Sequence, residues 1–179
     1  STIPSGANLH RIVMSPTDGE TAKQFLPYGS DQSQIPEDLW AWMKETEART
    51  GAPFIAMPHN SNISKGYMFN PELTMKGETI TADYARIRAE MEPVVEITQI
   101  KGDSETWPSL SPDDEFAEFN PYPNYIQVKQ EEYQAHEGDY IRSSLKNGLK
   151  IEDEIGVNPF LLAKTSEDFA DVRTLKDNF

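Results

Sequence analysis

Apolar residues recur at helical spacing in three segments of the chain, each bounded by residues that start or stop helices. Pro36 can open the first helix because its missing N–H is not needed at a first helical position, and Gly51 can close it. The second helix is predicted between Thr81, as its N-terminal cap, and Pro93. The third covers about residues 140–154, where apolar side chains form a stripe along one face.

Three shorter apolar segments are typical of β-strands. They cover residues 8–14, 54–57 and 94–100, and the last is rich in β-branched residues. The segment from the first strand up to residue 34 is predicted to be a loop, and a weakly amphipathic helix is predicted from Ser166.

The order of these elements, helix then strand in succession, predicts the fold class. Parallel neighbours need crossover connections that helices usually supply, so we expect an α/β fold with a mainly parallel sheet. A chain of 179 residues is the ordinary size of one domain, and residues 1–179 are expected to form a single one.

Ligands of such sheets gather at the carboxyl ends of the strands, and polar residues stand near those ends. His59 follows the second predicted strand, Glu96 lies near the end of the third, and His10 lies within the first. Asp103 and Glu105 follow the third strand. These residues are predicted to line one mouth, and the further candidates for this pocket are Arg11, Asn60 and Asn62.

Each candidate also has a structural interpretation. His59 can be a loop histidine without a metal, and His10 can be a hydrogen-bonded histidine of a strand. The Asp103-x-Glu105 pair lacks the spacing of a calcium loop and is typical of solvated carboxylates. Asn60 and its neighbour two residues on can serve to shape the turn after the strand.

The charge balance limits the expected partners. The chain has 30 Asp and Glu against 16 Lys and Arg, a formal net charge of -14, which would repel nucleic acid and anionic membranes. It has no cysteine, which excludes a disulfide framework and thiolate chemistry. No segment approaches the ~18 apolar residues of a membrane span and no secretory signal is evident, so the expected location is cytoplasmic.

Five strings of the sequence carry a resemblance to a known family. They are NLHR (8–11), PEDLWAWM (36–43), PHNSN (58–62), EPVVEITQIKGDSE (92–105) and GLKIEDEIGVNPF (148–160). In this order they resemble an uncharacterised bacterial family of unknown function that is related to the polymerase-and-histidinol-phosphatase (PHP) metal hydrolases. The resemblance covers about residues 8–160, and residues 161–179 form a divergent tail.

The resemblance implies a distorted barrel of strands and helices with metal ions at its carboxyl-end mouth, where water attacks a phosphoester or related bond. By this resemblance His59 matches the histidine of a Pro-His motif and is the metal-ligand candidate, with zinc, manganese or iron as the ion. His10 would point toward that mouth, and Glu96, Asp103 and Glu105 match the acidic block that follows.

Several ligands of that family have no counterpart in this chain: an upstream His-x-His pair, an Asp-His pair, a bridging glutamate and a downstream Asp-x-His block. We therefore expect a partial or remodelled PHP-like barrel that is a non-catalytic or degenerate fragment and acts as an oligomeric α/β module with a small-molecule pocket. Exposed strand edges and apolar faces favour a homo-oligomer. The alternative is a metal-dependent hydrolase of a phosphoester or similar small anionic substrate, completed across subunits.

Overall fold

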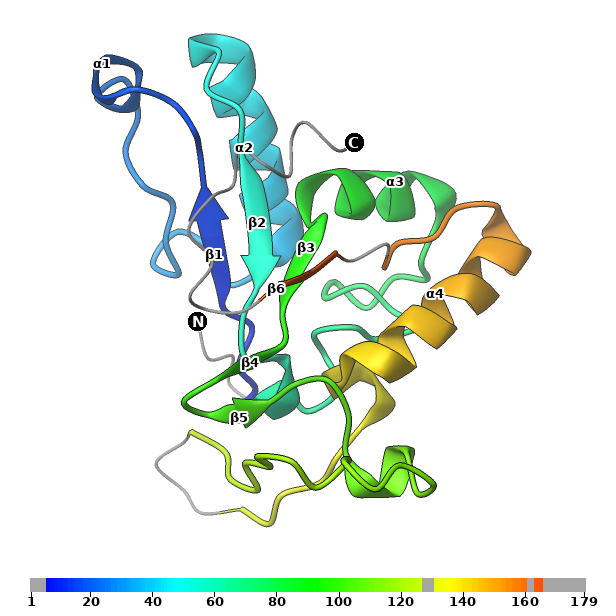
Figure 1. Ribbon diagram of the computed structural model, residues 1–179. Helices are drawn as coiled ribbons and strands as arrows, with labels where there is room; N and C mark the ends of the chain where they lie inside the picture. Colours follow the sequence, from blue (N-terminus) through cyan, green and yellow to red (C-terminus); the bar gives the residue numbers. More distant parts are fainter. Residues whose placement is uncertain (1–5, 127–130, 161–162, 166–179) are drawn as a thin grey trace.

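The computed structural model describes residues 6–126, 131–160 and 163–165 (Figure 1). Its helices are α1 (Gly19–Ala22), α2 (Pro36–Thr50), α3 (Ala82–Met91) and α4 (Ile141–Ile155), with short 3-10 turns η1 (Ser61–Ile63), η2 (Pro108–Leu110) and η3 (Glu137–Asp139). Its strands are β1 (Arg11–Met14), β2 (Ile55–Pro58), β3 (Val94–Glu96), β4 (Thr98–Gln99), β5 (Gly102–Asp103) and β6 (Ala163–Thr165). None of the described helices is long and apolar enough to cross a membrane.

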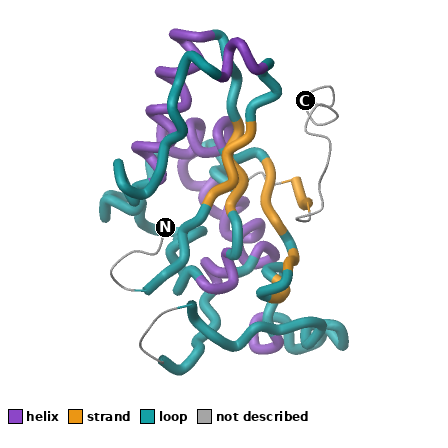
Figure 2. The backbone as a smooth tube through the Cα atoms, turned by 90° about the vertical axis from the view of Figure 1, so that its left-hand side faces the viewer, coloured by secondary structure: helices purple, strands orange, loops and turns teal. Residues whose placement is uncertain are grey.

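The strands form three two-stranded sheets within the described residues. β1 and β2 pair antiparallel, with Arg11 opposite Pro58 and Met14 opposite Ile55. Figure 2 shows these two strands running next to each other. β4 and β5 form an antiparallel hairpin, whereas β3 pairs with β6 in parallel. Because β2 also contacts β3, the strands β1, β2, β3 and β6 stand side by side (Figure 1).

The expected PHP-like barrel of mainly parallel strands is wrong. Two of the three strand pairs are antiparallel, all are short, and the described residues form no closed parallel barrel. The connection between β1 and β2 contains α1 and α2. It is long enough for β2 to pair with β1 in either direction. Alternation of helix and strand therefore did not determine the strand direction. The molecule is a small mixed α/β fold.

The predicted strand over residues 94–100 is interrupted after Glu96. The chain turns at Ile100, whose residue surface is 90% exposed, and returns as β5. The Gln99 side chain accepts a hydrogen bond from the Lys101 N–H within this turn. β-Branched composition predicted one long strand, but a local hairpin satisfies part of its backbone instead.

The three predicted helices are confirmed, and local signals set their ends. α2 begins at Pro36 and ends before Gly51, which adopts a left-handed φ of 73° that suits glycine. The Thr81 hydroxyl accepts a hydrogen bond from the Tyr84 N–H at the start of α3. α4 corresponds to the third predicted helix. The helix predicted from Ser166 lies outside the described residues.

The faces that these helices bury differ from the apolar faces predicted from the sequence. In α4, Leu149 is 63% exposed, while Gly148 is buried against Asn158. A Cβ at Gly148 would lie 2.3 Å from Asn158 Oδ1, so any larger residue there would require the Asn158 side chain to move. In α3 the charged Arg88 is buried. The short helix α1 lies within the segment that was predicted to be a loop.

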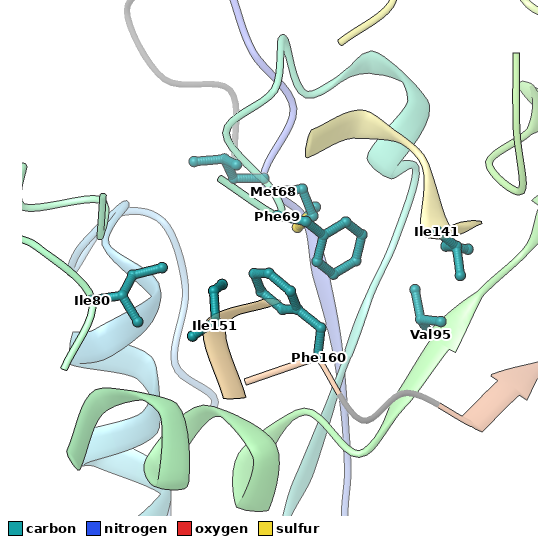
Figure 3. Close-up of a cluster of buried hydrophobic side chains, with 8 residues drawn as sticks. Met68, Phe69, Ile80, Val95, Ile141, Ile151 and Phe160 are labelled. Carbon is teal, nitrogen blue, oxygen red and sulfur yellow. The ribbon is translucent and has the colours of Figure 1, made fainter. Parts of the chain in front are cut away.

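Two clusters of buried apolar side chains form the core. The first joins α2, α3 and β2 through Trp40, Met43, Ala56 and Met91. The second lies between α4 and the strands (Figure 3), and its buried members are Leu9, Met68, Phe69, Ile80, Val95, Ile141, Ile151 and Phe160. Each large apolar side chain buried in this way contributes roughly 1.5–3 kcal/mol to stability.

A buried carboxylate, Glu92, joins three elements beside the first cluster. Its Oε1 accepts hydrogen bonds from Arg11 Nε on β1 at 2.7 Å and from Trp40 Nε1 on α2 at 3.0 Å. Its Oε2 lies 3.3 Å from Arg88 Nη2 on α3. Burial by itself raises the pKa of Glu92, but the guanidinium groups of Arg11 and Arg88 outweigh burial and hold this pKa below its ordinary value of 4.5.

We expect Glu92→Gln to lower the free energy of unfolding by roughly 3–5 kcal/mol at pH 7, because both guanidinium groups would stay buried without a counter-charge. Urea unfolding measures this loss. The matched control is Glu90→Gln, whose side chain is 60% exposed and pairs with Lys44 at the surface. That variant should lose no more than about 1 kcal/mol. Equal losses in the two variants would contradict the central role of Glu92.

The same carboxylate makes stability depend on pH. Its pKa is lower in the folded chain than in the unfolded one, so its contribution is complete above pH 4.5 and is lost as pH falls toward the folded-state value. The wild type should therefore lose more stability than Glu92→Gln when urea unfolding is compared at pH 7 and in acid. A pH dependence that is identical in both proteins would exclude this linkage.

Candidate functional site

The ends of three neighbouring strands bring His10, His59 and Glu96 to one place. His59 directly follows β2, and Glu96 is the last residue of β3. His10 directly precedes β1, and because β1 is antiparallel to β2, the start of β1 lies beside the end of β2. The His59 N–H accordingly donates to the His10 carbonyl across 3.0 Å. The structure thus joins three of the residues that the sequence placed at one mouth.

The imidazole of His59 is oriented by a buried carboxylate. His59 Nδ1 lies 2.6 Å from Glu96 Oε2, and the Asn60 N–H donates to Glu96 Oε1 across 3.3 Å. The Glu96 side chain is fully buried, whereas that of His59 is 15% exposed. An ionised carboxylate only accepts hydrogen bonds, so the imidazole hydrogen then lies on Nδ1 and leaves the lone pair on Nε2. Such a nitrogen can bind a metal ion or accept a proton.

A second imidazole stands over the first. The rings of His10 and His59 are stacked, with centroids 6.3 Å apart and an interplanar angle of 16°. Partial burial of its ring lowers the pKa of His10 to about 4, and the positive charges of Lys101 and Arg11 act in the same direction. His10 is therefore neutral at pH 7, the form in which imidazole binds metal ions.

The turn that carries His59 is held by an asparagine that the sequence analysis did not select. Asn8 Nδ2 lies 3.3 Å from the carbonyl oxygen of His59 and 3.4 Å from that of Asn60. Asn60 adopts a left-handed backbone (φ 54°, ψ 50°), which asparagine tolerates better than most residues. Asn8 begins the string NLHR, but its partners are distant in the sequence and no local pattern predicts them.

Several side-chain atoms beside His59 are buried without a hydrogen-bond partner. Within the described residues they are both amide atoms of Asn60, Oδ1 of Asn8 and Oγ of Ser61. All three residues are at most 4% exposed. An unpaired buried polar group costs roughly 1–3 kcal/mol, and native proteins retain few of them. Their concentration next to His59 is typical of a functional site rather than of an optimised core.

Asn62 has a structural role in this region. Its Nδ2 donates to the Lys101 carbonyl across 2.8 Å, and its N–H donates to Ser104 Oγ across 3.3 Å. The Tyr133 hydroxyl donates to the Asn62 carbonyl across 2.7 Å. Asn62 therefore attaches η1 to the β4–β5 hairpin, which lies below the strand ends.

The other candidates are directed elsewhere. Arg11 pairs with Glu92 in the core. The Glu105 carboxylate lies 3.1 Å from Arg142 Nε, and Asp103 Oδ1 accepts the Glu105 N–H at 2.5 Å. In the described part of the chain no three His, Asp or Glu side chains are grouped so as to hold a metal ion. Among the described candidates, the two imidazoles of His10 and His59 are the possible metal ligands that lie next to each other.

Comparison with known protein families identifies the family of the chain. The protein-family model described as "Protein of unknown function (DUF3604)" matches residues 1–166. No curated protein and no solved structure matches the chain. The description of this family names no activity and no relationship to PHP hydrolases.

We expect Glu96→Gln to lower the free energy of unfolding by roughly 1–3 kcal/mol, because a buried acceptor of two hydrogen bonds would be replaced by an amide that also carries donors. The nitrogen NMR signals of the His59 imidazole should move, since Nδ1 would lose its carboxylate partner. Glu118→Gln, at an exposed position, is the control and should change neither quantity. Unchanged His59 signals in Glu96→Gln would show that the carboxylate does not orient this ring.

Proposed function

The chain belongs to the DUF3604 family, and from this premise we propose that it carries part of the metal centre of a hydrolase related to the PHP family. The observation that supports this proposal is the contact between His59 and the fully buried Glu96. A histidine that gives one ring nitrogen to a carboxylate and keeps the other outward is the common arrangement of metal ligands.

His10 and His59 would hold the ion. The two residues come from adjacent strand ends, and one of their nearly parallel rings would turn so that both lone pairs meet the ion. The lowered pKa of His10 keeps its imidazole ready to bind a metal at neutral pH. Glu96 fixes the ring orientation of His59. A zinc, manganese or iron ion bound there would lower the pKa of a water ligand and so supply a nucleophile for hydrolysis of a phosphoester.

The positive side of the site favours a small anionic substrate. Lys101 lies close enough to His10 to lower the pKa of that imidazole. In a chain of net charge -14, such a local cation is a plausible contact for a phosphoester group.

Two imidazoles do not complete a catalytic centre, which usually takes three protein ligands. We propose that the remaining ligands come from a second copy of the chain or from another segment of a longer protein.

A second candidate function is a non-catalytic, self-associating module with a small-molecule pocket. It is favoured by the way Glu96 accepts hydrogen bonds from both the His59 side and the Asn60 backbone. That arrangement can also serve simply to close the ends of β2 and β3. Exposed large apolar side chains such as Ile100, Phe116 and Phe119 are suited to contact with another copy.

Metal binding separates these two functions. We expect protein purified without chelators to contain zinc, manganese or iron by elemental analysis, and zinc titration to reveal one saturable site. His59→Ala should abolish this binding, and Glu96→Gln should weaken it about 10–100-fold because the ligand would no longer be oriented. His136→Ala, at an exposed position, is the control and should bind as the wild type does.

The opposite result would support the non-catalytic module. In that case none of these proteins binds metal, and the stability lost in His59→Ala, roughly 1–3 kcal/mol because the buried Glu96 oxygen loses its partner, is the same with and without added metal. If the wild type does bind metal, hydrolysis of phosphoesters is measured on the metal-loaded protein, with His59→Ala as the inactive reference.

The origin of the missing ligands is testable by mass. If a second copy supplies them, light scattering should give a dimer or larger species in the presence of zinc and a smaller species after chelation. A mass that stays the same with and without zinc would argue against ligands shared between subunits. In that case the remaining ligands would have to come from another segment of a longer protein.

A further inference from the structure

β1 is the outermost strand in the described part of the chain. It pairs with β2 on one side, and none of the described strands lies on its other side (Figure 1). The edge of a strand presents backbone N–H and C=O groups that can pair with another chain. The register of the β1–β2 ladder determines which of these groups point outward.

Two residues of β1 turn their backbone groups away from β2. The His59 N–H donates to the His10 carbonyl across 3.0 Å, and these residues stand opposite each other when the register is continued beyond the ladder. Hydrogen-bonded and non-hydrogen-bonded pairs alternate along antiparallel strands. The next residue bonded to β2 is therefore Ile12, and its neighbours Arg11 and Val13 direct their N–H and C=O groups outward.

Three further observations agree with this outward edge. Pro58, which stands opposite Arg11, has no N–H to donate, as suits a pair that is not hydrogen-bonded. The Arg11 side chain is only 4% exposed although the residue as a whole is partly exposed, so solvent reaches its backbone. Among the described residues none forms a hydrogen bond with the outward N–H or C=O groups of Arg11 and Val13.

The loop beside β1 covers a face of the strand and does not pair with its edge. Residues of the segment from Tyr28 to Ile35 line a cavity of about 170 Å³ together with Arg11 and Val13. No backbone group of this loop bonds to β1 among the described residues. The backbone edge of β1 thus remains without a partner in this part of the chain.

The edge also lacks the features that usually prevent pairing between strands. Natural edges are protected by lysine, proline, inward charges or bulges. Residues 9–15 contain no lysine, proline or acidic residue, and the Arg11 side chain is bound to Glu92 in the core. Val13 is 36% exposed. The net charge of -14 is therefore carried elsewhere, and it does not oppose contact between two copies of this edge directly.

We propose that β1 pairs with β1 of a second copy of the chain, antiparallel and related by a twofold axis through Ile12. This edge is self-complementary, because the outward groups of Arg11 in each copy meet those of Val13 in the other and exchange both hydrogen bonds. Twofold dimers with such matching patches are the commonest oligomers of soluble proteins. The pairing joins the β1–β2 ladders of both copies into one antiparallel sheet. It goes beyond the metal site proposed at His59 and does not depend on it.

The register creates one close self-contact that a disulfide can test. Ile12 would face Ile12 of the second copy as a non-hydrogen-bonded pair, with Cα atoms about 4.5 Å apart, which a disulfide can span. Met14 lies on the same face of β1, but it would be about 13 Å along the strands from its own counterpart. The chain has no cysteine, so Ile12→Cys and Met14→Cys each introduce a single thiol.

The complete chains are oxidised with diamide in EDTA, which prevents association through metal ions, and are separated by non-reducing electrophoresis. We expect at least about tenfold more covalent dimer from Ile12→Cys than from Met14→Cys, because a disulfide does not span Cα atoms more than ~7 Å apart. Equal amounts of dimer from the two variants, or none from Ile12→Cys, would overturn the proposal.

Light scattering of the wild type in EDTA provides a second measurement, and the mass should rise with concentration toward that of a dimer. Val13→Pro removes an outward N–H and spares the ladder with β2, so it should stay monomeric. Val13→Thr keeps that N–H and should associate as the wild type does. A wild type that is monomeric throughout, or equal association of both folded variants, would contradict the pairing. His59→Ala should associate normally, which separates failure here from failure of the metal site.

Discussion

The structure depends on one buried carboxylate that must be neutralised. Glu92 lies in the core between Arg11 and Arg88, and a charge in that position is tolerated only with close, well-oriented partners. The three residues belong to α3, β1 and the segment that follows α3, so their pairing fixes the first strand against the third helix. The Trp40 indole adds α2 to the same group. The position of β1 is thereby set by electrostatics as well as by apolar packing.

The candidate site follows from where this places β1. A four-residue ladder with β2 puts the start of β1 beside the end of β2, and His10 meets His59 there. A mouth built from strand ends therefore arises without a parallel barrel. Because β1 is antiparallel to β2, the residues at the start of β1 lie at the same edge as the residues at the end of β2. Glu96 is the last residue of β3, and from there its carboxylate contacts the imidazole of His59.

The sequence predicted well what local chemistry determines. Pro36, Gly51 and Thr81 marked helix ends, because their effects act within one turn of the chain. Strand direction and the early end of β3 were not predictable, because they depend on pairing between segments far apart in the sequence. The exposure of Leu149 shows the same limit, since close contact between Gly148 and another segment decides which face of α4 is buried.

The candidate site was predictable to a similar degree. His10, His59 and Glu96 do lie together, but His10 was expected within a parallel strand and instead reaches the other two from the start of an antiparallel β1. Arg11 was assigned to the same mouth but turns to the opposite face, which a period of two along a strand already implied. The role of Asn8 was missed, because its hydrogen bonds reach residues about fifty positions away.

The short strand ladders have a consequence for the dynamics of the molecule. Ladders of two to four residues contribute few backbone hydrogen bonds, and the β4–β5 hairpin contributes no buried residue to either apolar cluster, whereas α2 contributes Trp40 and Met43. Regions with few buried contacts open locally at a lower free energy than the whole domain unfolds. Amide hydrogens of the β4–β5 hairpin are thus set to exchange with solvent long before those of α2, and the hairpin that Asn62 holds can open while the remainder of the fold stays intact.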